Sequence, residues 1–333
     1  MVIKKKRPTL QDVADLVGVT KMTVSRYLRD PTLVSKSLQV KIDQAVEESG
    51  YIPNRVPDIL SKAKSNAIGV LVPSLTNQVF AEVIRGIESI TEPAGYQTML
   101  AHYSYSEMLE EKSIASLLSY NVDGVILSES FHTEKVRKMI QTTGVPVVEI
   151  MDTVSPPIDQ AVGLDNQAAA KEMTKAMIEK KRRKIVYFAA RMDVRTRLKM
   201  QGYEEAMLEH NLLPISLQTE EASSFTLGTK LLHRMIDKYP EADGIFCTND
   251  DLAVGATYEC HRLGIKVPHD IGIAGFHGLD ISRVMVPKLA TVITPRERIG
   301  QVAAQELLAR LKGKRITQRV FDLGFEISFG ESL

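Results

Sequence analysis

At 333 residues the chain is long enough for two or three domains, and 44% apolar with 25% charged residues is an ordinary globular composition. No apolar run approaches 18 residues and two cysteines cannot build a disulfide framework, so a membrane protein and a disulfide-rich secreted domain are excluded. The net charge of +1 is uneven, because residues 1–65 hold 12 Lys and Arg against 7 Asp and Glu, which places the positive charge at the front.

The first fifty residues predict a small all-α head. The basic run at residues 4–7 leads into a polar segment and not into a signal-peptide core, which predicts a cytoplasmic protein; the run itself is a floppy tail or a phosphate contact. Hydroxyl residues that favour N-caps precede three helical patterns, which are Leu10–Val17 after Thr9, a helix from Thr20 to about Arg29, and a helix from Ser35 to Gly50. The first two have the spacing of a helix-turn-helix.

The second of these helices has the outer face of a DNA-recognition helix. Its residues Val24 and Leu28 point inward to the other two helices, which leaves a polar and basic face of Lys21, Met22, Ser25, Arg26 and Arg29. We expect Lys21, Met22 and Arg26 to contact base edges, and Thr20, Thr23 and Ser25 to contact phosphates. A solvated helix face is the alternative, but solvation gains nothing from the large apolar Met22.

Residues 51–65 form a candidate hinge. Between Pro53 and Asn66 the large apolar residues are Val56, Ile59 and Leu60, too few for a core face, so the segment orders only against a partner. Any helix here begins at about Pro57 and ends near residue 63. An apolar Leu60 on a basic stalk is typical of a wedge that enters the minor groove of DNA; a plain interdomain linker is the alternative.

Residues 66–333 alternate strand-length apolar runs with amphipathic segments. The runs are Ala67–Val72, Val122–Leu127, Val145–Ile150, Ile185–Ala189, Gly244–Cys247 and Ile271–Gly275, and the amphipathic segments include Val79–Ile90, Ala168–Ile178, Gly202–Leu208 and Leu252–Leu263. This alternation predicts parallel sheets covered by helices on both faces. More than 250 residues exceed one such sheet, so we expect two doubly wound lobes with a cleft between them.

Polar residues recur where the predicted strands end, which is where open α/β sheets bind ligands. They are Ser74 and Asn77, His102, Ser128 and Glu129, Asp152, Asp165 and Asn166, Arg191, Asn249 and Asp250, and His277. Any one of them could instead be a loop residue or a helix cap. Their recurrence at successive strand ends favours a binding site.

Enzyme classes find little support. The first strand is not followed by a glycine-rich turn, and neither a P-loop nor a nucleophile elbow is present, so no cofactor, metal or catalytic residue is expected. Cys247 and His277 could be a nucleophile and a base, but a strand-end cysteine in an apolar run is usually core. An exported two-lobed sugar-binding protein remains an alternative of another class, and the basic head argues against it.

The chain resembles the lactose-repressor (LacI) family of transcription regulators along its whole length. The head and hinge motifs are Thr9-Leu-Gln-Asp-Val-Ala14, Gly18-Val-Thr-Lys-Met-Thr-Val-Ser-Arg26 and Gly50-Tyr-Ile-Pro-Asn-Arg55. The sensor motifs are Ala67-Ile-Gly-Val70, Asn249-Asp-Asp-Leu-Ala-Val-Gly255, Ala274-Gly-Phe276 and Thr291-Val-Ile-Thr-Pro295. The resemblance implies a helix-turn-helix head at 1–50, a DNA-ordered hinge at 51–65, and a two-lobed, periplasmic-binding-protein-like sensor and dimerisation domain at 66–333.

Further expectations follow from this resemblance. The lobes would comprise about 66–164 with 294–324 and about 165–292 with 325–333, the chain crossing near Leu164, Ile293 and Phe325. Residues implied to contact a pseudo-palindromic double-stranded operator are Thr9, Gln11, Thr20, Lys21, Met22, Thr23, Ser25, Arg26, Arg29, Tyr51, Asn54, Arg55 and Leu60. Residues implied to contact a small effector are Ser74, Gln78, Phe80, His102, Glu129, Asp152, Asp165, Arg191, Lys199, Asn249 and His277.

Three stretches are most similar to the branch of the family that regulates gluconate utilisation: Pro73–Ala81, Tyr96–His102 and Gly275–Gly278. Regulators of L-idonate or of another sugar acid are the nearest alternative. No heptad-bearing tail follows the sheet pattern, so a homodimer is expected.

Four positions depart from the common family pattern. Pro57 and Asp58 replace an alanine and a basic residue in the hinge, and both departures argue against hinge folding and phosphate contact at these positions. Lys199 replaces an arginine and His277 an aspartate in the effector pocket, and loss of the aspartate favours an acid over a neutral sugar. We therefore expect gluconate as the effector, with Lys199 and His277 as donors to its carboxylate; a solvated lysine and a satisfied loop histidine are the alternative.

Overall fold

The computed structural model describes residues 7–54 and 64–333. The chain divides into two compact units, Met1–Ser65 and Asn66–Leu333, which we call the head and the sensor. Among the described residues, no helix combines the length and the apolar character needed to cross a membrane.

The head is a bundle of three α-helices with one short 3₁₀ turn. Its elements are α1 (Leu10–Val17), α2 (Lys21–Arg29), η1 (Pro31–Leu33) and α3 (Lys36–Ser49). Thr9 caps α1 and Thr20 caps α2 through their side-chain oxygens, while α1 and α3 end at glycines with left-handed backbone angles. The three predicted helices are therefore confirmed to within a residue.

The core of the head is the predicted inward face of each helix. Val13, Ala14, Val24 and Ile42 are fully buried together. Tyr27, which the apolar pattern did not include, also packs into this core, and its hydroxyl donates to Asp43 Oδ1 at 2.5 Å. The aromatic ring thus joins α2 to α3, which keeps the outer face of α2 at a fixed orientation.

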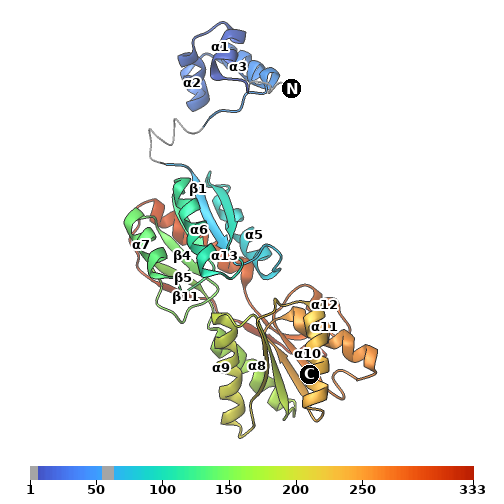
Figure 1. Ribbon diagram of the computed structural model, residues 1–333. Coiled ribbons are helices and arrows are strands. Elements are labelled where there is room, and N and C mark those ends of the chain that lie inside the picture. Colours follow the sequence, from blue (N-terminus) through green and yellow to red (C-terminus); the bar gives the residue numbers. More distant parts are fainter. Residues whose placement is uncertain (1–6, 55–63) are drawn as a thin grey trace. The chain divides into compact units, whose positions relative to one another are not determined.

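The sensor contains two six-stranded sheets within residues 64–333 (Figure 1). The first has the order β11-β5-β4-β3-β1-β2, with β1 at Ala67–Val72, β2 at Gln97–His102, β3 at Gly124–Leu127, β4 at Val147–Ile150, β5 at Gln160–Gly163 and β11 at Val320–Asp322. The second has the order β12-β10-β9-β8-β6-β7, with β6 at Ile185–Ala190, β7 at Ile215–Thr219, β8 at Gly244–Cys247, β9 at Gly272–His277, β10 at Ala290–Ile293 and β12 at Glu326–Ser328. The paired strands run parallel except β12, which is antiparallel to β10.

Helices cover both faces of each sheet. In the first lobe these are α5 (Val79–Thr91) and α13 (Arg296–Leu311) on one face and α6 (Glu107–Ser119) and α7 (Glu134–Thr143) on the other. In the second lobe they are α8 (Asn166–Glu179) and α9 (Val194–Glu209), and then α10 (Phe225–Lys238) and α11 (Asp250–Leu263), with the short α12 (Ile281–Val284) before β10. The predicted pair of doubly wound lobes is confirmed.

Strand residues alternate between the two faces of each sheet. In β1, Ile68 and Val70 join the core under α5 and α13, whereas Leu71 joins the core under α6 and α7. Because both faces are buried, the strand is apolar throughout and shows no polar alternation. The chain passes from one sheet to the other after β5, after β10, and between β11 and β12. Three connecting segments therefore join the two lobes.

One predicted helix boundary is wrong. The segment predicted at Gly202–Leu208 is the second half of α9, which begins at Val194. The first half escaped the apolar pattern because Arg195, Thr196 and Lys199 are polar residues that face inward and are buried. Their burial leads to the binding cavity.

Candidate functional site

A cavity lies between the two sheets of the sensor. Its walls come from both lobes and from the carboxyl ends of seven parallel strands, as expected for an open α/β fold. The lining residues are Asn77, Val79, Phe80, Tyr105, Met151, Ala190, Arg191, Asp193, Arg195, Thr196, Lys199, Ser223, Thr248, Asn249 and His277.

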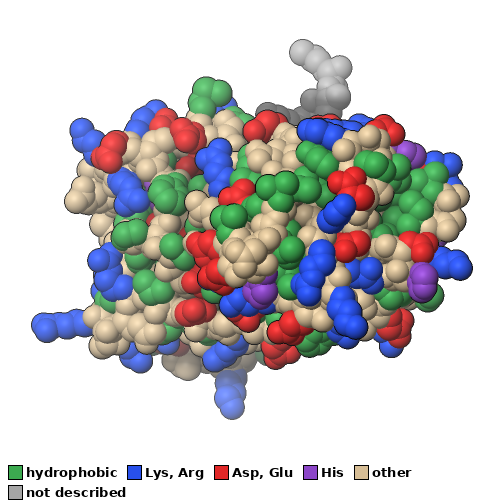
Figure 2. All heavy atoms as spheres, turned by 90° about the horizontal axis from the view of Figure 1, so that it is seen from below, with side chains coloured by type: hydrophobic (Ala, Val, Ile, Leu, Met, Phe, Trp, Pro, Cys, Tyr) green, Lys and Arg blue, Asp and Glu red, His purple; other side chains and the backbone are tan. Residues whose placement is uncertain are grey.

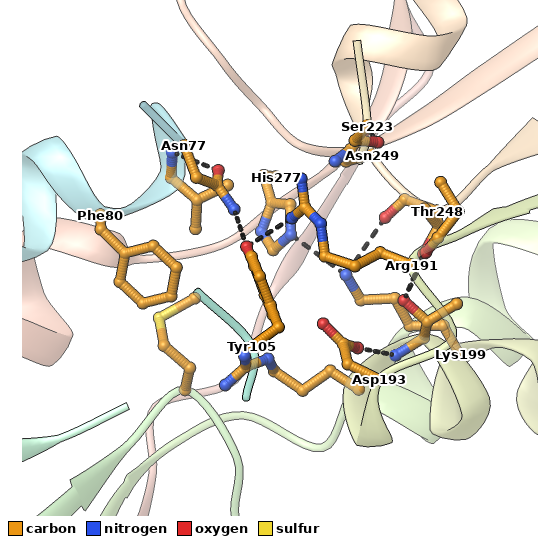
Figure 3. Close-up of a pocket in the computed structure, with 15 residues that line it drawn as sticks. Asn77, Phe80, Tyr105, Arg191, Asp193, Lys199, Ser223, Thr248, Asn249 and His277 are labelled. Carbon is orange, nitrogen blue, oxygen red and sulfur yellow. Dashed lines mark hydrogen bonds between the residues drawn. The ribbon is translucent and has the colours of Figure 1, made fainter. Parts of the chain in front are cut away.

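Tyr105 and Arg191 join the lobes across this cavity (Figure 3). Tyr105 follows β2 of the first lobe, and its hydroxyl accepts hydrogen bonds from Asn77 Nδ2 at 3.1 Å and from Arg191 of the second lobe. The Arg191 guanidinium carbon also lies 4.2 Å from the centroid of the Tyr105 ring, a cation–π distance. Arg191 Nε is buried without a hydrogen-bond partner, so this guanidinium keeps a free donor.

Arg195 makes a second connection between the lobes. Its guanidinium is buried and donates to the Ser128 carbonyl oxygen, which follows β3 of the first lobe. Burial alone would lower the pKa of Arg195, but the nearby charges of Glu129 and Asp193 outweigh it and raise that pKa. Arg195 is therefore a permanent cation at the cavity wall.

Lys199 and His277 meet on the second-lobe side of the cavity (Figure 3). Lys199 Nζ lies 3.1 Å from His277 Nε2 and donates to the Thr248 carbonyl oxygen at 3.2 Å. Burial lowers the pKa of Lys199 to about 7. Burial and then the adjacent Lys199 charge lower the pKa of His277 well below 6.5, so the imidazole is neutral and accepts from the amine.

Both ring nitrogens of His277 have partners in the empty cavity, since Nε2 faces Lys199 Nζ and Nδ1 faces Thr294 Oγ1 at 3.3 Å. Donation from His277 to an anion stays a prediction. The alternative of a solvated lysine is wrong, since only 4% of the Lys199 surface is exposed.

The cavity wall is rich in positive charge. Arg191, Arg195 and Lys199 line it against one carboxylate, Asp193, whose Oδ1 is engaged as the N-cap of α9 by the Thr196 amide at 2.8 Å. Ser223 donates to Asn249 Oδ1 at 2.8 Å and adds neutral hydrogen-bonding groups on the opposite wall. Such a wall suits an anion that also carries hydroxyl groups.

Backbone strain is concentrated at the same place. Four lining residues, Tyr105, Met151, Arg191 and His277, have φ between 58° and 104°, the left-handed region that non-glycine residues rarely adopt. Each such residue costs about 1 to 3 kcal/mol, and strain of this kind is typical of functional sites.

The structure brings together five of the eleven residues expected to contact an effector: Phe80, Arg191, Lys199, Asn249 and His277. The other six lie outside the lining. Ser74, Gln78 and His102 are in loops or at strand ends beside it. Glu129 accepts a hydrogen bond from the Tyr103 hydroxyl, and Asp152 accepts one from the Ser130 hydroxyl. The Asp165 carboxylate caps α8.

Several lining residues were absent from the predicted effector contacts, namely Tyr105, Asp193, Arg195, Thr196, Ser223 and Thr248, while Asn77 was named only among the polar strand ends. The sequence contains a signal that could have identified some of these residues. Asp193 precedes Thr196 by three residues directly after the predicted strand at Ile185–Ala189, which is the spacing of a helix N-cap and its N3 position. A cap at that strand end would have placed Arg195 and Lys199 on the first turns of a helix facing the cleft.

The outer face of α2 is the candidate nucleic-acid surface of the head. Lys21, Met22, Ser25, Arg26 and Arg29 are all exposed, with 69% of the Met22 surface accessible. Thr20 and Thr23 share a hydrogen bond of 3.0 Å at the start of α2, whereas Thr9 caps α1 and Gln11 contacts Asp15. Tyr51 packs against the head core. Asn54 is the last described residue before the gap at 55–63, and Arg55 and Leu60 lie outside the described residues.

The face of the sensor seen in Figure 2 contrasts with this basic surface. Lys and Arg side chains lie interspersed with Asp and Glu and with apolar patches. This mixture agrees with the balance of −4 in residues 66–333, so the charge that attracts a polyanion is in the head.

Family models match both units. A model of bacterial regulatory proteins of the lacI family matches residues 9–54. A model of periplasmic binding proteins and the sugar binding domain of the LacI family matches residues 65–321.

Individual relatives match over the full length. The chain is 58% identical over 331 residues to the HTH-type transcriptional regulator GntR of Escherichia coli (strain K12), covering 99% of this chain and 100% of the relative. It is 46% identical over 332 residues to the HTH-type transcriptional regulator IdnR of the same strain, again covering 99% and 100%. A crystal structure of a LacI family transcriptional regulator from Silicibacter pomeroyi matches with a TM-score of 0.92 and 32% identity, covering 98% of this chain and 99% of that one.

Proposed function

The chain belongs to the LacI family of bacterial regulatory proteins, and on that premise we propose that it is a homodimeric repressor whose operator binding is controlled by gluconate. Its relatives are transcription regulators and not enzymes, and it is itself a DNA-binding transcription repressor of this family. The gluconate, the dimer and the contacts that follow are the proposal.

One observation supports a sugar acid as effector: the cavity presents Arg191, Arg195 and Lys199 against a single carboxylate, Asp193, that is already engaged as a helix cap. A neutral sugar would bring no counter-charge to this cationic wall, whereas a carboxylate would supply one to the buried Lys199. Gluconate supplies one carboxylate and a chain of hydroxyls, for which Asn77, Tyr105, Ser223 and Asn249 offer donors and acceptors.

L-Idonate is the second candidate, because regulators of L-idonate are the nearest alternative that the sequence motifs leave open and the chain is also 46% identical to IdnR. It carries the same carboxylate and the same number of hydroxyls, so charge cannot separate the two acids. A phosphorylated aldonate would bring two further negative charges to the same three cations.

Apolar exposure on the second lobe supports a dimer. Phe225 begins α10 and packs its backbone against Gly255 of α11, and Tyr258 lies one turn further along α11. Both aromatic side chains are about half exposed, at 47% and 52%. We take two such rings on adjacent helices as support for a dimer contact here, because an isologous contact would bury them in pairs.

The dimer would place one α2 in the major groove of each half-site of a pseudo-palindromic operator. The segment at 51–65, which includes Arg55 and Leu60, would form the hinge that enters the minor groove at the centre. Effector binding between the lobes would then change the separation or orientation of the two hinges, and so the affinity for DNA. Such a protein acts on chromosomal DNA in the cytoplasm.

Calorimetric titration of the full-length protein, with and without operator DNA, tests this function. We expect gluconate to bind and to release the operator in a gel-shift assay, and glucose to do neither. L-Idonate and 6-phosphogluconate in the same series identify the preferred acid. Glucose binding as tightly as gluconate would overturn the proposal.

A further inference from the structure

Lys199 is a buried amine whose partners are all uncharged. Its Nζ contacts the Thr248 carbonyl oxygen at 3.2 Å, His277 Nε2 at 3.1 Å and the face of the Phe276 ring at 3.9 Å from its centroid. None of the carboxylates in residues 64–333 forms an ion pair with it. A charged ammonium in this position lacks the counter-ion that buried charges require.

The contact with His277 limits the charge of the pair. Two nitrogens at 3.1 Å share one hydrogen bond only if one of them offers a lone pair, so the pair holds at most one positive charge. The charged groups that face the pair are Arg191, Asp193 and Arg195 from the start of α9 and the loop before it, Asp250 from α11, and Arg296 from α13. Burial raises the pKa of Asp250 to about 7, so the three arginines outweigh the aspartate charge near the pair, which disfavours adding a positive charge to the empty cavity.

A ligand anion reverses this balance. Arg191 already stacks on Tyr105, and Arg195 already donates to the Ser128 carbonyl oxygen, so both guanidinium groups have partners in the empty protein. Lys199 lines the same cavity and has the strongest need of a negative partner. A carboxylate placed against it would supply the missing counter-charge and favour the ammonium form.

We propose that the effector's carboxylate binds at Lys199, and that the Lys199–His277 pair takes up a proton when the effector binds. This inference rests on the proposed function, because it requires a sugar acid as the effector. It makes these two residues the pair that selects an acid over a neutral sugar, and it couples operator release to pH.

The expected pH dependence follows from the free amine. Burial lowers the pKa of Lys199 to about 7, so Lys199 in the empty cavity is largely charged at pH 6 and largely neutral at pH 8. If the bound state is fully charged, uptake rises from about 0.1 proton at pH 6 to about 0.9 at pH 8, and affinity falls nearly tenfold per pH unit above pH 7.5.

Titration calorimetry of the full-length protein with gluconate measures this uptake directly. At each pH between 6.0 and 8.5 the titration is repeated in buffers of different ionisation enthalpy. The slope of the observed binding enthalpy against the ionisation enthalpy of the buffer gives the number of protons taken up. We expect a positive slope that grows with pH, together with the fall in affinity.

Three variants separate this role from a structural one. Lys199→Met keeps the length of the side chain without a titrating group, and its proton uptake should vanish. His277→Asp gives Lys199 a fixed counter-ion in the empty cavity, so its uptake should also vanish. Arg191→Gln removes a cation that does not titrate in this range, and should retain the uptake even where affinity falls.

The outcomes are distinguishable. Gluconate binding with equal affinity from pH 6.0 to 8.5 and without buffer dependence would overturn this inference and leave the proposed function standing. Persisting proton uptake in Lys199→Met would overturn it as well. Failure of every aldonate to bind at any pH would overturn the proposed function, and this inference with it.

Discussion

A methyl group on Gly86 of α5 would lie 2.2 Å from the carbonyl oxygen of Glu297 in α13. The reciprocal contact is as close, because a methyl group on Gly300 of α13 would lie 2.1 Å from the Val83 carbonyl oxygen in α5. The two helices therefore pack backbone against backbone on the sheet of the first lobe. This contact joins a segment near residue 80 to one near residue 300, after the chain has passed through the second lobe and returned.

Gly300→Ala should lower the free energy of unfolding by about 1 to 3 kcal/mol, because the added methyl forces the helices apart. Alanine is the better helix former by about 1 kcal/mol, so a net loss isolates the effect of the close packing. Urea unfolding followed by circular dichroism measures it. Gln305→Ala, at an exposed position on the same helix, is the matched control, and a stabilised Gly300→Ala protein would contradict the packing described here.

The sequence predicted elements whose buried side chains are apolar, and it missed an element whose buried side chains are polar. The strand at Ala67–Val72 was predicted to the residue, because both its faces lie in apolar cores. The first half of α9 was missed, because its inward face is Arg195, Thr196 and Lys199. An apolar pattern cannot detect a helix whose buried side is a binding cavity.

The site was predictable in class but not in detail. Polar strand ends indicated a cleft between two lobes, and His277 and Asn249 do line it. Asp165 satisfies the same pattern, yet its carboxylate caps α8, because an aspartate at a strand-to-helix junction serves either purpose. Tyr105 could not be predicted, since it reaches Arg191 only through a loop with left-handed backbone angles.

The surroundings of His132 predict that the folded protein loses stability at alkaline pH. Its side chain is fully buried, with Nδ1 2.8 Å from Glu110 Oε1 and Nε2 3.1 Å from Glu149 Oε1. Burial alone would lower the pKa of His132, but the two carboxylates outweigh burial and raise it to about 9. A raised pKa stabilises the fold fully below pH 6.5, and that contribution is lost as the pH rises through 9.

Comparison of the wild-type protein with His132→Gln isolates this effect. The difference in unfolding free energy between the two should shrink by about 2 to 3 kcal/mol between pH 6 and pH 10. Chemical unfolding at a series of pH values measures it. A difference that does not vary with pH would mean that the histidine is buried in its neutral form.

Lys21 and Met22 should determine which operator is preferred. Both side chains are exposed on the outer face of α2, whereas the hydroxyls of Thr20 and Thr23 are paired at its start. Replacing Lys21 and Met22 together should change the preferred base pairs, with about 1 to 3 kcal/mol of discrimination at each contacted position. Binding to a library of single-base operator variants measures this. A uniform loss of affinity across the library would instead assign the two residues to phosphate contacts.

Leu60 lies outside the described residues, and its role as a wedge is a prediction from the sequence. Leu60→Ala should weaken operator binding by about 1 to 3 kcal/mol and reduce DNA bending, because the wedge favours a bend that brings further contacts. Effector affinity should be unchanged, since the sensor cavity is built from other residues. Footprinting that shows equal affinity and equal bending would rule the wedge out.

Tyr105 should strengthen effector binding by holding the lobes together. Its hydroxyl is the acceptor for Asn77 in one lobe and Arg191 in the other, while its ring lies against the Arg191 guanidinium. Tyr105→Phe keeps the ring and removes only the acceptor, so the contribution of the shared hydroxyl is measured separately from the stacking. A hydrogen bond to a charged donor contributes about 1.5 to 3 kcal/mol, and the effector's own oxygens can replace part of it.

We therefore expect gluconate affinity to fall by about 1 to 2 kcal/mol in Tyr105→Phe, with a larger radius of gyration for the ligand-free protein as the lobes separate. Calorimetry and small-angle scattering measure the two quantities. Tyr120→Phe, at an exposed position of the same lobe, is the matched control. The opposite result, tighter gluconate binding, would mean that the Tyr105 hydroxyl occupies Arg191 in competition with the effector. The contact between the lobes would then belong to the empty state, and the effector would have to break it in order to bind.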